Sequence, residues 1–218
     1  MSVFAGPKIP YYSGLLMHLD AGNPKSYPGS GTTWTDLSGN ARNATVVGSP
    51  TFTNGYFDAT SDANYFSAPS YSHGTNDFTY SMWITIDTVD AASTLFEDGS
   101  WTDTLLFRHE TNLINVYAEG ALYGNFSFTP VAGAWYNIVF KRESSTAYAY
   151  ANGVQIGSTF ALSVDVNLAN QNLFLMRSQH TTRQSDDGKI AVFSMYTRAL
   201  SVAEIKQNYN ALRGRFGL

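Results

Sequence analysis

Glu97, Asp98 and Asp103 form a cluster of carboxylates in the middle of the chain. Paired carboxylates perform glycoside hydrolysis, in which one protonates the leaving group and the other attacks or activates water, at a separation of roughly 5–10 Å. The three residues lack the even spacing that would direct them from one strand into one cleft, and Gly99 interrupts them. No serine lies in a nucleophile-elbow motif either. We therefore expect a protein that is not an enzyme.

Oxygen-bearing side chains on the irregular front segment are candidates for a metal site. Asp20, Asp36 and Asn40 provide the carboxylate and amide oxygens that calcium prefers. The alternative is that they close turns through hydrogen bonds to nearby backbone. Zinc is not expected, because cysteine is absent and the four histidines are scattered, at His18, His73, His109 and His180. Calcium is thus the candidate cofactor.

Aromatic residues in polar surroundings are candidates for binding a sugar, because a ring covers the apolar face of the sugar while polar neighbours fix its hydroxyls. Trp101 with Asp103, in the polar stretch that begins at Glu97, is the first candidate. Tyr123 follows, and then Tyr71 with His73. The alternative is ordinary surface exposure, since a chain with 14 Tyr, 14 Phe and 4 Trp must expose some of them.

Composition and charge narrow the choice of partners. Apolar residues make up 44% of the 218 residues, which is enough for a packed core, whereas charged residues make up only 14%. The net charge is -4, and no basic cluster is present that could neutralise phosphates or anionic lipids. No stretch has the length and apolar character of a membrane span, and we expect no classical export signal. We expect neither nucleic acid nor a membrane as a partner.

Short strands are the elements that must position these residues. Runs rich in β-branched and aromatic residues recur between turn residues, which is typical of a sandwich or barrel. Asn152-Gly153 predicts a two-residue hairpin turn, because both positions of such a turn need positive φ. The strand at 77–87 should have one apolar and one wetter face, and residues 22–53 should form a packed loop. We expect strands at 14–20, 56–60, 77–87, 104–110, 113–119, 122–128, 135–143, 147–153, 154–160, 172–178 and 189–196.

One helix is predicted, from Val202 to Leu212. Ser201 and Glu204 have the spacing of a capping box, and Gly214 fits the position after the last turn. The helix should dock on the edge of the sandwich. The chain then divides into an extended arm at 1–13, one domain at 14–212 and a short basic and aromatic tail at 213–218.

Both ends of the chain are too apolar for free termini, and two prolines exclude regular structure in the arm. We expect the arm to lie along the surface of a partner, the alternative being a frayed terminus. The residues expected to dock are Phe4, Ile9, Tyr11, Tyr12, Arg213, Arg215 and Phe216.

Four ordered motifs resemble a known family. They are WTDLSGN (34–40), FTYSMWI (78–84), WYNIV (135–139) leading to YANG (150–153), and GKI (188–190) leading to YTRALSVAEI (196–205). Together they resemble the laminin-G-like domains of the concanavalin A-like lectin/glucanase superfamily, over residues 14–205. The resemblance implies an all-β jelly-roll sandwich of two antiparallel sheets with one short C-terminal helix. It also implies ligand sites on the concave face or the rim loops, often beside calcium.

The chain departs from the family pattern at two places. Asn137 stands where relatives commonly have histidine, and Ala191-Val192 stand where they commonly have an acidic pair. If those groups bind calcium or form hydrogen bonds at the rim in relatives, this chain lacks them at these positions.

A narrower resemblance concerns the two ends of the domain. GLLMHLDAGNPKSYPGSGTTWTDLSGN (14–40) and NYNALRGRFGL (208–218) resemble modules in virion proteins of marine bacteriophages. This implies a non-enzymatic structural protein on the virion surface, as a capsid decoration or fibre component. Its partners would be other virion proteins, of capsid or tail, and cell-surface glycans. The alternatives are a soluble carbohydrate-binding lectin and, third, a glycoside hydrolase.

Overall fold

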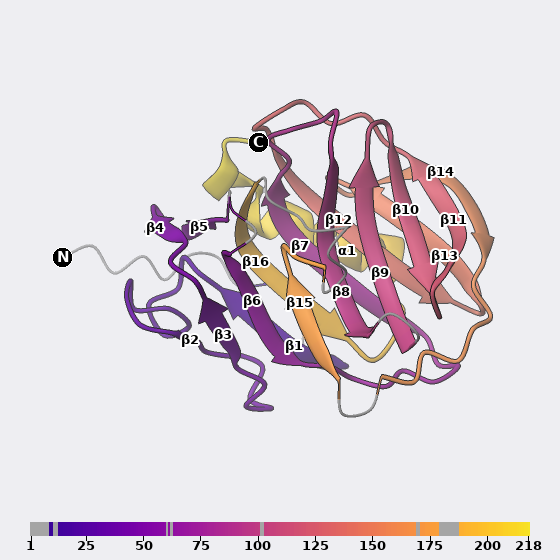
Figure 1. Cartoon of the computed structure of the whole chain (residues 1–218), viewed down its shortest axis with the longest axis horizontal. Helices are drawn as coiled ribbons and strands as arrows, with labels where there is room; N and C mark the ends of the chain where they lie inside the picture. Colours follow the sequence, from indigo (N-terminus) through magenta and orange to yellow (C-terminus); the bar gives the residue numbers. More distant parts are fainter. Residues whose placement is uncertain are drawn as a thin grey trace.

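Two antiparallel β-sheets pack face to face in the computed structural model, and one short helix follows near the C-terminus (Figure 1). The predicted all-β jelly-roll fold is confirmed. The structure describes residues 9–10, 13–59, 61, 63–100, 103–168, 171–178 and 188–218, and only the backbone at Ser100 and Asp103. Within these residues no helix has the length and apolar character needed to cross a membrane.

Each sheet has eight strands. Sheet A runs in the order β14 (Val154–Ala161), β13 (Thr146–Ala151), β12 (Trp135–Glu143), β7 (Phe78–Thr85), β16 (Lys189–Tyr196), β5 (Tyr56–Asp58) and β4 (Thr51–Thr53), and β1 (Leu15–Asp20) also pairs with β16. Sheet B runs in the order β11 (Ala121–Ser127), β10 (Leu113–Ala118), β9 (Asp103–Glu110), β8 (Ala92–Ser100), β15 (Asn172–Leu175), β6 (Tyr65–Pro69), β3 (Ala44–Val47) and β2 (Thr33–Trp34).

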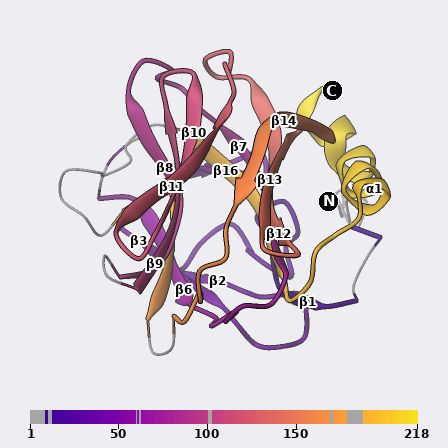
Figure 2. The same cartoon turned by 90° about the vertical axis from the view of Figure 1, so that its right-hand side faces the viewer.

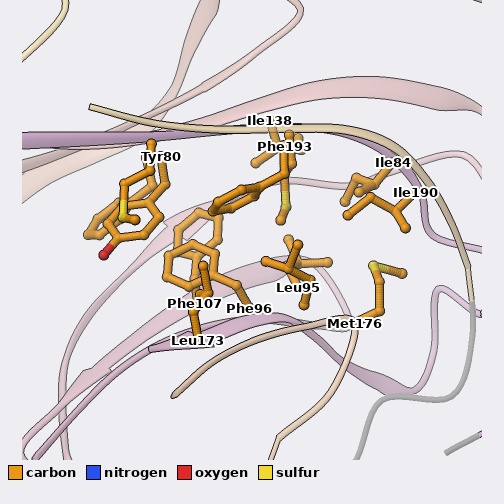
Figure 3. Packing of buried hydrophobic residues seen from close by; sticks show 14 of the residues in the cluster. Tyr80, Ile84, Leu95, Phe96, Phe107, Ile138, Leu173, Met176, Ile190 and Phe193 are labelled. Atoms are coloured by element: carbon orange, nitrogen blue, oxygen red, sulfur yellow. The ribbon is translucent and has the colours of Figure 1, made fainter. Parts of the chain in front are cut away.

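The core lies between the sheets and follows from alternation along the strands, since every second side chain points inward. Large apolar side chains from the two sheets meet there (Figure 3). Those labelled from sheet A include Tyr80, Ile84, Ile138 and Phe193, and those from sheet B include Leu95, Phe96, Phe107 and Leu173. The core therefore unites segments from most of the chain.

The C-terminal helix α1 (Val202–Leu212) begins with the predicted capping box. Ser201 Oγ accepts from the Glu204 amide at 3.3 Å, and the Ser201 amide donates to Glu204 Oε2 at 2.8 Å. The predicted role of Gly214 is wrong. The chain continues in the 3₁₀-helix η1 (Arg213–Phe216), and Gly217, with φ of 74°, takes the left-handed position that ends it.

Both faces of β7 are buried, so the expected wetter face of this strand is wrong, and the helix covers a sheet face instead of the edge (Figure 2). Trp83 of β7 is 1% exposed. Its ring stacks on Phe216 with centroids 4.2 Å apart and on Tyr209 at 5.8 Å. The alternation of residues in β7 does not reveal that Trp83 is covered, because the residues that cover it, Tyr209 and Phe216, lie far along the chain.

Several strands were not predicted. The segment 22–53 contains β2, β3 and β4 instead of a continuous loop, and β6 and β8 were missed. In β8 the sequence Glu97-Asp98-Gly99 favours a loop by local propensity. Pairing with β9 on one side and β15 on the other overrides that propensity, and Glu97 and Asp98 are both buried.

Gly157 is required where β14 lies against β11, the edge strand of the other sheet. A Cβ at this position would lie 2.7 Å from the Phe126 Cα and from the Ser127 nitrogen, and φ is +60°. We expect Gly157→Ala to lower the free energy of unfolding by about 2–3 kcal/mol. Urea denaturation measures the change.

Gly214→Ala is the control for that experiment. Gly214 has open space around its Cα and no positive φ. We expect its replacement to change stability by less than about 0.5 kcal/mol. Equal stability of the two variants would contradict the close approach of β14 and β11.

Candidate functional site

A cavity of about 420 Å³ lies at the end of the sandwich where β7 begins and β16 ends. The loop 70–77, which joins β6 to β7, forms one wall, and the two residues after β16 form another. The lining residues are Tyr71, His73, Thr75, Asn76, Asp77, Thr197 and Arg198. Apart from the Tyr71 ring, the lining is predominantly polar.

Arg142 of β12 holds the loop from beneath. Its side chain is 1% exposed, and its guanidinium donates to the carbonyls of Asn76 (Nε, 3.0 Å), Val164 (Nη1, 2.7 Å) and Gly74 (Nη2, 2.6 Å). Burial lowers the pKa of Arg142, and the nearby Asp77 carboxylate opposes that shift. A planar fork with several fixed donors can satisfy three carbonyls at once, which a lysine ammonium cannot do in the same geometry.

The segment 164–168 anchors the loop from the side. Gly74, with φ of +59°, and Val166 exchange backbone hydrogen bonds of 2.9 Å in both directions. Ser72 Oγ accepts from the Leu168 amide at 2.8 Å and donates to Asn167 Oδ1 at 3.1 Å. The loop is therefore fixed on two sides, as a preformed ligand site requires.

Arg198 forms the opposite wall as part of an ion pair. Its Nη2 lies 2.7 Å from Glu204 Oε1, its Nη1 lies 2.9 Å from Oε2, and its Nε donates to the Ser13 carbonyl at 2.8 Å. Hydrogen bonds from Arg198 lower the pKa of Glu204 to about 2. The wall is rigid, and the charge of Arg198 is balanced by its partner.

A buried hydrogen-bonded chain begins at the floor of the cavity. His73 Nε2 lies 2.9 Å from the hydroxyl of Tyr80, which donates to Asp98 Oδ2 at 2.7 Å. Burial, reinforced by the positive charge of Arg142, lowers the pKa of His73 to about 3. Burial raises the pKa of Asp98 to about 7, against the hydrogen bond from Tyr80. The chain links the cavity to the interior of the core.

Two of the predicted sugar contacts, Tyr71 and His73, line this cavity together. Tyr71 is half-buried in its wall, and its ring lies 5.0 Å from that of His73. His73, however, is 2% exposed, so it offers a ring edge and not a stacking face.

Tyr123, another predicted sugar contact, does not line this cavity. Tyr123 is exposed on β11, with its hydroxyl 3.4 Å from Glu119 Oε2. Asp103 begins β9, and nothing further is described of its side chain. Trp101 lies outside the described residues.

A smaller hollow of about 150 Å³ lies on the far side of the segment 164–168. Thr104, Ala118 and Glu119 line it together with that segment. Because Val166 pairs with Gly74, the segment that lines this smaller hollow also supports loop 70–77.

The predicted metal ligands serve other roles. Asp36 Oδ1 accepts from the amides of His18 and Ser38 at 2.8 and 2.9 Å, so this carboxylate closes a turn. Asn40 donates through Nδ2 to the Leu16 carbonyl at 3.0 Å. No group of three or more histidine, aspartate or glutamate side chains suited to a metal occurs in the described part of the chain.

Asp20, a predicted metal ligand, and Arg215, a predicted docking residue, form an ion pair with each other. Arg215 Nη1 lies 2.8 and 2.9 Å from the two oxygens of Asp20. Calcium binding stays an untested prediction, without a preformed ligand set at these three positions.

The expected docking residues that are described, apart from Arg213, pack on their own domain. Ile9 is 3% exposed in the cluster beneath α1. Phe216 stacks on Trp83, and Arg213 stays exposed. Phe4, Tyr11 and Tyr12 lie outside the described residues. The tail covers aromatic side chains of sheet A through Phe216, and its docking on a partner stays a prediction.

The two departures from the family pattern lie under the same cover. Asn137 is buried and donates through Nδ2 to Ser81 Oγ at 3.2 Å. Ala191 and Val192 are also buried there. Acidic groups at 191 and 192 would lie against the helix, so these positions are not rim positions in this chain.

Sequence reasoning missed most of the polar lining. Asn76 and Asp77 follow Gly74 directly before a predicted strand, which is a signal for a structured polar turn. Thr197 and Arg198 belong to the YTRALS motif, from which we predicted only the family and the start of the helix. Their meeting at one cavity depends on the pairing of β7 with β16.

Comparisons with known proteins identify the class. A family model described as the concanavalin A-like lectin/glucanases superfamily matches residues 58–206, and the chain belongs to this superfamily. A search of curated protein sequences found no match.

Solved structures with the same fold include binding domains of toxins and a sialidase. The receptor-binding domain of a botulinum neurotoxin C/D mosaic serotype has a TM-score of 0.71 at 12% identity, over 92% of this chain and 52% of that one. The ligand-binding domain of botulinum neurotoxin serotype D in complex with N-acetylneuraminic acid has 0.70 at 12%, over 91% and 51%. Trypanosoma rangeli sialidase in complex with sialic acid has 0.70 at 14%, over 96% and 34%. The chain thus spans about half of the toxin domains and a third of the sialidase.

Proposed function

We propose that this chain is a non-enzymatic carbohydrate-binding module whose ligand site is the cavity between loop 70–77 and Arg198. The observation that carries this proposal is the composition of the wall. Tyr71 lines the cavity together with Asn76, Asp77, Thr75 and Thr197, residue types that carry an amide, a carboxylate and hydroxyls. A ring with a few fixed polar groups is the arrangement that holds a sugar, and the volume falls in the usual range of ligand sites.

The fold supports the same function. Two of the solved structures with this fold are named as toxin domains that bind a receptor or ligand, one of them with N-acetylneuraminic acid bound. The rigid support of the loop by Arg142 lowers the ordering cost that a ligand must overcome.

Binding without hydrolysis is supported by the carboxylates of the site. Among the described residues that line the cavity, Asp77 is the single carboxylate. Its Oδ1 already accepts from the Ser144 amide at 2.8 Å. Cleavage of a glycosidic bond needs a second carboxyl group across the bond.

We expect Tyr71→Ala to weaken glycan binding at least about tenfold, because the stacking surface is lost while the loop anchors remain. A glycan array identifies ligands, and calorimetry on the best of them measures the change. Tyr123→Ala is the matched control, since it removes an exposed tyrosine that does not line the cavity. Equal loss in both variants, or a flat array for the wild-type protein at millimolar sugar, would refute this assignment of the site.

The virion surface is a further hypothesis about where such a module works. It is supported by the resemblance of residues 14–40 and 208–218 to bacteriophage virion modules. Under this hypothesis the module contacts other virion proteins and presents the cavity to cell-surface glycans. Mass spectrometry of purified particles tests it, and absence of the chain from particles would exclude it.

A further inference from the structure

The buried chain beneath the cavity connects three parts of the fold. His73 comes from loop 70–77, Tyr80 from β7 in sheet A and Asp98 from β8 in sheet B. All three are at most 2% exposed. His73 is one of the residues that line the cavity, and its Nε2 lies 2.9 Å from the buried Tyr80 hydroxyl. Nδ1 is therefore the ring nitrogen that can form a hydrogen bond with a ligand in the cavity.

The direction of the hydrogen bonds depends on the proton of Asp98. An ionised Asp98 can only accept, so the Tyr80 hydroxyl donates to it over 2.7 Å. The Tyr80 oxygen then accepts from His73, which must carry its proton on Nε2. In this state Nδ1 carries no proton and is a hydrogen-bond acceptor at the cavity wall.

Protonation of Asp98 at Oδ2 reverses each bond in the chain. One proton enters at His73 Nδ1 from the cavity, the Nε2 proton passes to the Tyr80 oxygen, and the Tyr80 proton passes to Asp98 Oδ2. The chain takes up one proton in total, His73 and Tyr80 stay neutral, and Asp98 loses its negative charge. Tyr80 now donates to Nε2, and Nδ1 carries an N–H donor.

We propose that Asp98, acting through Tyr80 and His73, determines whether the cavity wall presents a hydrogen-bond donor or an acceptor, and so which sugar groups bind. This inference rests on the proposed carbohydrate-binding function. It makes Asp98 a specificity-determining residue that does not touch the ligand.

The surrounding charges allow this change near neutral pH. Arg42 faces Asp98, Tyr80 and His73, and Arg142 of β12 faces Tyr80 and His73. Asp77 and Asp165 offset the charge of Arg142. Burial raises the pKa of Asp98 to about 7 and lowers that of His73 to about 3. Across pH 5–9 the carboxyl therefore titrates, whereas the imidazole stays neutral.

The two states select different ligand groups. A hydroxyl both donates and accepts, so it bonds to Nδ1 in either state. A carboxylate only accepts, so it bonds to Nδ1 only when that nitrogen carries a proton. Acidic sugars should bind more tightly at low pH, and neutral sugars should bind equally well at low and at high pH.

Nitrogen NMR of the histidine rings, on the whole chain without ligand, tests the relay. We expect the His73 proton to move from Nδ1 at pH 5.5 to Nε2 at pH 8.5. His18, whose Nδ1 is bonded to Ser194 Oγ at 2.9 Å, is the internal control and should keep one tautomer. In Asp98→Asn the tautomer of His73 should no longer depend on pH. An unchanged His73 tautomer in the wild-type protein overturns the relay, whether or not sugars bind.

Calorimetry with N-acetylneuraminic acid and with galactose at the same two pH values tests the selection. We expect the acidic sugar to bind about tenfold more tightly at pH 5.5, and galactose to bind equally at both. If the affinities for the two sugars change equally with pH, the proposed selection between acidic and neutral sugars is refuted. A change of tautomer together with a flat glycan array refutes the proposed function, and the selection with it, while the proton relay stands.

Discussion

Replacing Arg142 with methionine should lower the free energy of unfolding by about 3–5 kcal/mol and abolish ligand binding at the cavity. Methionine approximates the length of the arginine stem but has no donor. The Gly74 carbonyl keeps the Val166 amide as a donor, but the carbonyls of Asn76 and Val164 lose the guanidinium, and each buried carbonyl without a donor costs about 1–3 kcal/mol. Relief of the buried charge offsets part of this cost, so the expected total lies within the combined range of about 2–6 kcal/mol.

Urea denaturation and calorimetry measure the two effects. Arg213→Met is the matched control, because Arg213 is exposed on the C-terminal tail. We expect the control to lose less than about 0.5 kcal/mol. A loss below 1 kcal/mol in Arg142→Met, with binding intact, would show that the anchoring of loop 70–77 does not depend on this guanidinium.

Removing residues 213–218 should lower the free energy of unfolding by about 3–4 kcal/mol. The loss of Phe216 exposes the rings of Trp83 and Trp135, to which its centroid distances are 4.2 and 4.7 Å. Burial and stacking of one aromatic ring contribute about 2–3 kcal/mol. The loss of Arg215 leaves Asp20 without its ion-pair partner, which adds about 1 kcal/mol at this partly exposed position.

Thermal denaturation measures the loss, and tryptophan fluorescence reports the new exposure as a shift to longer wavelength. Phe216→Ala in the full chain separates the ring from the ion pair and should account for most of the loss. A chain ending at Gly217 is the control, because Leu218 is 44% exposed. Wild-type stability of the shortened chain would mean that the tail does not support sheet A.

The sequence determined those parts of this protein whose causes are local. The hairpin at Asn152-Gly153 has the positive φ values of 52° and 77° that the residue types predict. The capping box at Ser201 and Glu204 likewise starts α1 where the spacing places it. Most of the longer strands were predictable because alternation along each of them matches the core between the sheets.

Only the tertiary structure decided where polar residues become buried or gather into a site. Glu97-Asp98 reads as a loop by propensity, yet pairing between β9 and β15 makes it part of a central strand. The cavity unites Tyr71 and Asp77 with Arg198, which strand pairing brings to the same end of the sandwich. Such contacts depend on the pairing of distant segments. The spacing of neighbouring residues determines on which face of a strand a side chain lies, but it does not determine which distant segment covers that face.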